Sequence, residues 1–167
     1  MLKRMLMTSM FACLVATGAQ AADDDALISF KVMTPETALE AAQAALADCR
    51  QRGFQVAIAV LDRFGVTQVI LRDRFAGPHT PETARRKAWT ALSFRTDTNA
   101  LVDVTQAGTP QSGVRHVPGA LMIGGGVQVQ AAGALVGAIG VSGAPSGEMD
   151  DACAKAGIAA IEEKLAF

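Results

Sequence analysis

The stretch that decides the fold is Val136–Pro145, with the sequence VGAIGVSGAP. Its β-branched and apolar residues predict a buried strand over 135–142, and the Gly, Ala and Pro that follow predict a tight connection. Ser146 is a good helix N-cap, and the acids in the next five positions suit the positive end of a helix dipole. We therefore expect this strand to lead directly into a last helix that runs to about Lys164.

Four other apolar runs in the chain resemble this strand in composition. Together, the five runs predict strands at residues 55–61, 66–72, 120–123, 127–131 and 135–142. The first two flank the turn sequence Asp62-Arg63-Phe64-Gly65, which predicts a hairpin. The others are separated by Gly124-Gly125-Gly126 and by Gly133, residues that interrupt strands. The sequence thus predicts a five-stranded, mainly antiparallel sheet.

Helices are predicted before and after the first hairpin in the sequence. Thr34-Pro35-Glu36 and Thr80-Pro81-Glu82 each supply a cap, a first-turn proline and an acid. The first helix should end at Gly53 and the second at about Phe94, with one or two further turns at 99–104. The expected order is α-β-β-α-(α)-β-β-β-α, an α/β chain of the α+β type in which helices flank the sheet.

The N-terminus has the features of a secretory signal peptide. Two cations, Lys3 and Arg4, precede an apolar run at 5–16, and the small-residue pattern Ala19-Gln20-Ala21 follows it. This order is typical of cleaved export signals. The run is shorter than the ~20 residues that span a bilayer, so we expect no membrane span. Cleavage after Ala21 would place the protein in the periplasm or outside the cell.

Removal of residues 1–21 leaves a length that fits one domain. We expect a flexible leader at 22–33 and a single domain at 34–167. The remaining chain has 13 cationic and 16 acidic side chains, a formal net charge of −3. This charge gives no indication of a nucleic-acid partner or of binding to an anionic membrane.

Two cysteines, Cys49 and Cys153, remain after cleavage. An even pair in an oxidising compartment favours a disulfide, and two buried free thiols are the alternative. Cys49 lies near the end of the first predicted helix and Cys153 near the start of the last one. These ends meet if the two helices pack antiparallel on the same face of the sheet.

Four motifs resemble the GlcG/HbpS family. They are VLDRFG at 60–65, ARRKAWTA at 84–91, GGG at 124–126 and VGAIGVSGAP at 136–145. The resemblance covers about residues 34–165 and extends to the C-terminal domain of some corrinoid adenosyltransferases. It implies a five-stranded antiparallel sheet between helices, a homo-oligomer, and haem or a related tetrapyrrole as the small-molecule ligand. It places no iron ligand on a matching position.

The chain has two histidines, His79 and His116, and both lie in predicted loops. Neutral imidazole is a common ligand of haem iron, so each is a candidate metal ligand, with a solvated loop histidine as the alternative. We expect His116 to matter more, because Arg115 beside it could pair with a haem propionate. The thioether of Met122 is a further possible ligand, although core filling explains it as well.

Other residues could hold the acidic groups of a ligand. Arg85 and Arg86 form a basic cluster with Lys87, which is either a propionate site or a solvated helix face. The connection from Gly143 to Ser146 precedes a helix, and its backbone N–H groups could hold a carboxylate or phosphate. A tight turn that needs glycine explains the same residues.

No arrangement of Ser, His and acid indicates nucleophilic catalysis, and no cysteine has an evident base. We expect an exported haem- or tetrapyrrole-binding protein. One alternative is an enzyme that degrades haem or acts on a small organic acid at residues 143–147. Another is an oligomeric assembly protein without a ligand.

Overall fold

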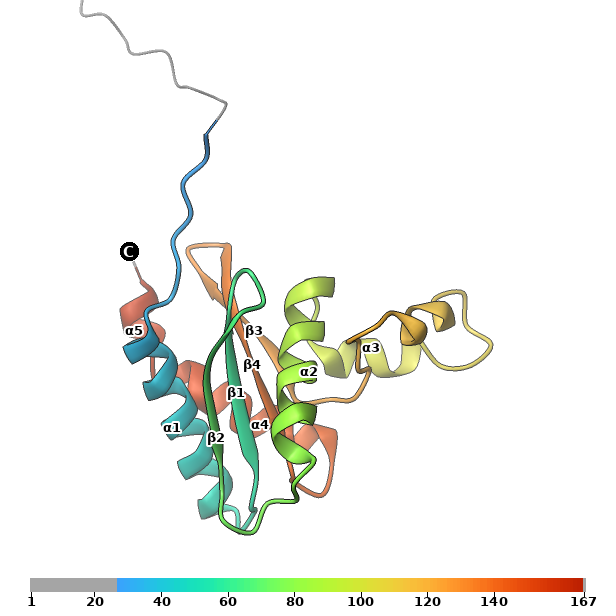
Figure 1. Cartoon of the computed structure of the whole chain (residues 1–167), viewed down its shortest axis with the longest axis horizontal. Helices are drawn as coiled ribbons and strands as arrows, with labels where there is room; N and C mark the ends of the chain where they lie inside the picture. The colour runs from blue at the N-terminus through green and yellow to red at the C-terminus, as the bar shows by residue number, and fades with distance from the viewer. Residues whose placement is uncertain (1–26, 167) are drawn as a thin grey trace, which may run out of the picture. The chain divides into compact units, whose positions relative to one another are not determined.

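The computed structural model, which describes residues 27–166, contains an antiparallel sheet with the strand order β2-β1-β4-β3 (Figure 1). Its strands are β1 (Ala57–Asp62), β2 (Thr67–Arg72), β3 (Gly126–Ala131) and β4 (Ala134–Ser142). β1 and β2 form the predicted hairpin. Asp62 closes its turn, because Oδ1 accepts the backbone N–H groups of Phe64 at 2.9 Å and Val66 at 3.0 Å. β3 and β4 form a second hairpin, and β4 pairs with β1.

The prediction of five strands is wrong, because the described residues form four. Residues 120–123 do not join the sheet, although Ala120 and Met122 are buried. Side chains of α2 (Thr80–Phe94) form hydrogen bonds with the backbone groups of this segment instead. Leu121 N–H donates to Thr90 Oγ1 at 2.8 Å, and Arg86 donates to the carbonyl oxygen of Ala120 at 2.7 Å. The segment therefore packs on a helix, and β3 remains a sheet edge.

The predicted helices form with small changes at their ends. The structure has α1 (Pro35–Gln51), α2 (Thr80–Phe94), α3 (Thr98–Val104), a 3-10 turn η1 (Ser112–His116), α4 (Gly147–Ala159) and α5 (Glu162–Leu165). Thr34 and Ser146 are N-caps as predicted, whereas Thr80 is the first residue of its helix and donates to the Gly77 carbonyl. Within residues 27–166, no helix is long and apolar enough to cross a membrane.

The last predicted helix is interrupted near its end. α4 stops at Ala159, and α5 starts only at Glu162. Between them the backbone N–H of Ile161 donates to the carbonyl oxygen of Ile158 at 3.0 Å. This tighter turn separates α4 from α5, and Ile161 within it is fully buried in the core.

Helices cover both faces of the sheet. α1 and α4 pack together on one face, where α1 contacts β1 and β2 and α4 contacts β4 and β3. α2 lies on the other face, across the central strands β1 and β4 (Figure 1). The predicted leader ends in the first layer, because Met33 is 5% exposed and belongs to the core beside α1. Its residues 27–33 have no helix or strand.

α2 approaches the sheet closely enough for backbone to touch backbone. A Cβ atom on Gly140 of β4 would overlap the carbonyl oxygen of Ala84, and one on Gly126 of β3 would overlap the carbonyl oxygen of Lys87. Only glycine fits at such positions. The alanines of α2 complete this contact, which is why the helix buries Ala84, Ala88 and Ala91 completely.

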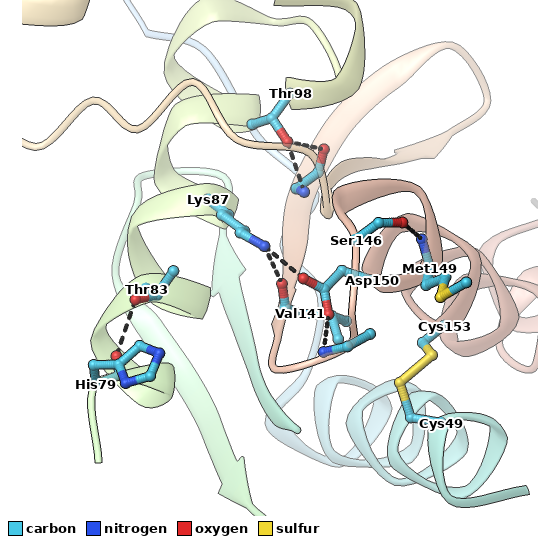
Figure 2. Close-up of polar contacts among 12 residues, drawn as sticks. Cys49, His79, Thr83, Lys87, Thr98, Val141, Ser146, Met149, Asp150 and Cys153 are labelled. Carbon is cyan, nitrogen blue, oxygen red and sulfur yellow. Dashed lines mark hydrogen bonds and ion pairs between the residues drawn. A yellow bond between two sulfur atoms is a disulfide. The ribbon is translucent and has the colours of Figure 1, made fainter. Parts of the chain in front are cut away.

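The predicted disulfide between Cys49 and Cys153 is confirmed, and it joins α1 to α4 (Figure 2). The two Cα atoms lie 5.5 Å apart, within the range that a disulfide spans. Both residues are fully buried in the core between the helices. The end of α1 meets the middle of α4 and not its start, because Cys153 is the seventh of the 13 residues of α4. The bond ties α4 to α1.

Removing the disulfide should lower stability substantially. The bond closes a sequence separation of 104 residues, so the double variant Cys49→Ala, Cys153→Ala should lose about 2–4 kcal/mol through a larger unfolded-state entropy. Thermal unfolding measures this loss. A reductant should lower the midpoint of the wild type towards that of the variant and leave the variant unchanged. Equal midpoints for the oxidised wild type and the variant would contradict this account.

Candidate functional site

A cleft of about 780 Å³ opens at the end of the sheet where β1 begins and β4 ends. The loop before α2 forms one wall, and the connection from β4 to α4 forms the other. Four apolar side chains from separate segments line it: Phe54, Phe75, Ile123 and Pro145. Its volume and mixed lining are typical of small-molecule sites.

A buried ion pair forms the inner end of this cleft (Figure 2). Lys87 of α2 is 2% exposed, and its Nζ donates to Asp150 Oδ2 at 2.7 Å and to the Val141 carbonyl oxygen at 3.0 Å. Asp150 Oδ1 accepts the backbone N–H of Ala144 at 2.9 Å. Burial raises the pKa of Asp150, and the charge of Lys87 opposes that rise. The pair thus links α2, the end of β4 and the first turn of α4.

The wall before α2 is held by a second ion pair. Arg50 at the end of α1 makes a two-point contact with Asp73, at 2.8 and 3.0 Å. The hydrogen bond from Arg50 lowers the pKa of Asp73 to about 2, so this carboxylate stays charged at neutral pH. Asp73 starts the loop that carries Phe75, which is 79% exposed, and His79. The loop is therefore fixed at its base and presents an aromatic ring and an imidazole at the cleft.

His79 lies at the entrance of the cleft, immediately before α2. Its carbonyl oxygen accepts the hydroxyl of Thr83 at 3.0 Å, which leaves the exposed imidazole ring outside that contact (Figure 2). Gly143 and Ser146 line the opposite wall. The structure thus brings together three of the residues selected from the sequence, His79, Gly143 and Ser146.

The remaining selected residues lie outside this cleft. His116 is exposed in η1, and the guanidinium of the neighbouring Arg115 donates to the carbonyl oxygens of Thr105 at 2.6 Å and Val102 at 2.8 Å. The Arg115 guanidinium is thus engaged in holding the loop after α3. Arg115 also borders a smaller cavity of about 220 Å³ together with Met122.

The two arginines of α2 have structural partners as well. Arg85 pairs with Glu82 one turn earlier, at 2.7 and 2.8 Å, which raises the pKa of Arg85. Arg86 donates to the carbonyl oxygens of Gly119 and Ala120. The basic cluster is therefore divided: Arg85 faces solvent, Arg86 holds the segment before β3, and Lys87 turns inward.

Sequence reasoning missed the apolar walls of the cleft and, among its polar residues, Lys87, Asp150 and Gln55. Lys87 was grouped with its neighbours, although it shares the helix face of Ala84 and Ala91 at spacings of three and four, where a charge indicates a buried partner. Asp150 was assigned only to the helix dipole. Gln55 has a buried Oε1 that accepts no hydrogen bond within the described part of the chain, and no pattern marked it. A buried polar oxygen without a donor is unusual in a folded protein.

No metal centre formed by protein side chains is evident in residues 27–166. No group of three or more His, Cys, Asp or Glu side chains there could hold a metal ion. Any metal bound by His79 would therefore need most of its ligands from another source, such as the ring nitrogens of a tetrapyrrole.

Comparisons of sequence and of structure both relate the chain to HbpS and PduO proteins. A family model described as haem degrading protein, HbpS-like, matches residues 33–159, a range that contains the whole cleft. The corrinoid adenosyltransferase PduO of Salmonella typhimurium is 36% identical over 121 residues, which are 71% of this chain and 36% of that protein. The chain therefore spans about a third of the length of this relative.

The fold is shared with solved structures, among them HbpS and PduOC. A double mutant of Streptomyces reticuli HbpS is 40% identical, with a TM-score of 0.75 and coverage of 86% of this chain and 97% of that one. A complex of PduOC with haem is 32% identical, with a TM-score of 0.73 and coverage of 78% and 96%.

The Lys87–Asp150 pair should be essential for stability. Lys87→Met leaves a buried carboxylate without its partner, and we expect a loss of about 3–5 kcal/mol in the free energy of unfolding. Arg85→Met is the matched control on the same helix, because its partner Glu82 is 61% exposed, and it should cost less than about 1 kcal/mol. Denaturant unfolding measures both.

A double variant separates charge from packing. Lys87→Met with Asp150→Leu removes both charges, so it should be more stable than Lys87→Met alone. A loss for Lys87→Met no larger than that for Arg85→Met would contradict the assignment of a buried ion pair.

Proposed function

Because the chain belongs to the HbpS-like family, we propose that it binds haem in the cleft between the loop before α2 and the start of α4. The observation that carries this proposal is the exposed imidazole of His79 beside apolar walls from Phe54, Phe75 and Ile123. A tetrapyrrole needs these two properties together, an axial nitrogen ligand and a cover for its planar, apolar faces. The haem complex of PduOC supports the same ligand class.

His79 is the proposed iron ligand in this cleft. Its main chain is fixed by the first turn of α2, and its ring is accessible at the entrance. His116 stays the alternative ligand, but its position in η1 is outside the cleft lining. We therefore place His79 ahead of His116, in contrast to the expectation from the sequence.

The opposite wall suits the acidic groups of haem. The first backbone N–H groups of α4, beginning at Gly147, have no carbonyl partners within the helix, and the helix dipole adds positive potential there. Ser146 caps the helix by accepting Met149 N–H at 3.4 Å. Backbone N–H groups would bind a propionate at this wall. Such binding does not need Arg85, Arg86 or Arg115, which the sequence suggested as propionate partners.

Haem degradation is the second candidate function, because the description of the family model names that activity. Loss of the Soret band with ascorbate and oxygen, beyond the rate for free haemin, would distinguish it from binding alone. A stable spectrum under the same conditions would leave binding as the function.

We also propose export and self-association. The signal-like residues 1–21 support export and lie outside the described residues. The intact mass of protein recovered from the periplasm tests cleavage after Ala21. A homo-oligomer is supported by the exposed apolar residues Val66 and Ile70 at the edge strand β2, with exposed fractions of 58 and 44%. A monomer at micromolar concentration in light scattering would disprove self-association.

Haemin titration tests the main proposal. The wild type should give a saturable Soret shift, and His79→Ala should weaken binding about tenfold or change the spectrum through loss of the axial nitrogen. His116→Ala is the matched control and should behave like the wild type. Absence of saturable binding would overturn the proposal, and a changed spectrum for His116→Ala alone would move the iron ligand to His116.

A further inference from the structure

A second cleft lies at the other end of the sheet, away from the proposed haem site. It has a volume of about 470 Å³ and is formed by the turn after β1, the turn before β4 and the last turn of α2. Figure 1 shows these three segments at the same end of the sheet. α2 has 15 residues and is therefore about 22 Å long. His79 lies at the start of α2 and the second cleft at its last turn, so the length of the helix separates them. The two clefts are therefore separate sites.

Hydrogen-bond donors and cations dominate the polar lining of this cleft. Arg63 and Arg95 contribute guanidinium groups, and Ser93 contributes a hydroxyl, while no carboxylate side chain lines the cleft. The nearest acid of the hairpin, Asp62, is 7% exposed and accepts hydrogen bonds from its own turn and from Gln68 at 3.2 Å. The lining of the cleft therefore has no acidic side chain that could neutralise Arg95.

Arg95 is placed for an external partner. It ends α2 in the left-handed conformation, with φ 49°, and its backbone N–H caps the helix. Its side chain is exposed, and its guanidinium makes no hydrogen bond or ion pair with residues 27–166. The left-handed backbone is a common way of ending an α-helix, because it lets the N–H of Arg95 donate to the carbonyl oxygens of Ala91 and Leu92.

Aromatic rings form the apolar part of the lining. Trp89 is half-buried, and a Cβ atom on Gly65 would lie 3.4 Å from its Cδ1 and 3.5 Å from its Nε1. The Nε1–H of Trp89 donates to no group in the described residues. Phe64 is exposed, and the guanidinium of Arg63 lies 5.8 Å from the centre of its ring. Planar surface and cationic groups thus occur side by side.

We propose that this second cleft binds a small aromatic carboxylate. The guanidinium of Arg95, the Ser93 hydroxyl and the Trp89 N–H match a carboxylate, because all are donors and Arg can bind both of its oxygens. The faces of Trp89 and Phe64 match an aromatic ring. An inorganic anion has no planar apolar face to pack against these rings. The volume lies within the range of small-molecule pockets.

The fluorescence of Trp89 provides a direct test, because it is the only tryptophan and the chain has no tyrosine. Benzoate is the probe, added to the signal-free protein without haem, with excitation where benzoate does not absorb. We expect a saturable change in emission, with binding at least about tenfold weaker in Arg95→Gln. Arg52→Gln is the matched control, because Arg52 lies on α1 in an exposed pair with Asp48, and its titration should match the wild type.

Two further measurements test whether the aromatic ring contributes to binding and which cleft holds the benzoate. Inorganic phosphate should bind more weakly than benzoate, and His79→Ala should leave benzoate binding unchanged. Absence of a saturable change with benzoate would overturn the proposal. So would equal binding of phosphate and benzoate, or an unchanged affinity in Arg95→Gln. Loss of benzoate binding in His79→Ala would assign the ligand to the first cleft.

Discussion

The close contact between α2 and the sheet at Gly126 and Gly140 is the constraint on which the rest of the structure depends. At both positions the helix backbone occupies the space of a side chain, so any larger residue would move α2 outward. At this short separation Lys87 reaches the end of β4 and the first turn of α4. A wider separation would leave two buried charges without partners, at a cost of several kcal/mol. The buried ion pair therefore depends on the packing of small residues.

The ion pair in turn defines the proposed haem cleft. Asp150 holds the backbone N–H of Ala144 and so fixes the connection between β4 and α4. The disulfide ties the same helix to α1 from the opposite side. The other wall depends on α1 too, through the contact of Arg50 with Asp73. Both walls are thus anchored to buried elements, and a ligand meets a site that is already formed, which reduces the ordering cost of binding.

The two ends of the sheet carry different chemistry on one scaffold. At the first end, one exposed imidazole faces a helix start and apolar walls. At the second end, arginines and aromatic rings gather around two hairpin turns. The buried layers supply packing, and most of the polar groups that face the clefts come from loops and from the ends of helices. A shared fold with HbpS therefore leaves room for ligand differences at either end.

The sequence by itself determined the local elements. Caps and prolines located the helix starts at Pro35 and Gly147, glycines located the turns, and a cysteine pair indicated the disulfide, because each signal acts over a few residues. Only the tertiary structure decided that residues 120–123 bond to α2 and stay outside the sheet. It also decided the role of Lys87, whose partner Asp150 is 63 residues away in the sequence. The same holds for the two histidines: the sequence favoured His116 because of its neighbour Arg115, and the packing of distant segments places only His79 at the cleft. Contacts between residues far apart in the sequence depend on how the helices pack on the sheet. No local sequence pattern encodes the distance between these layers.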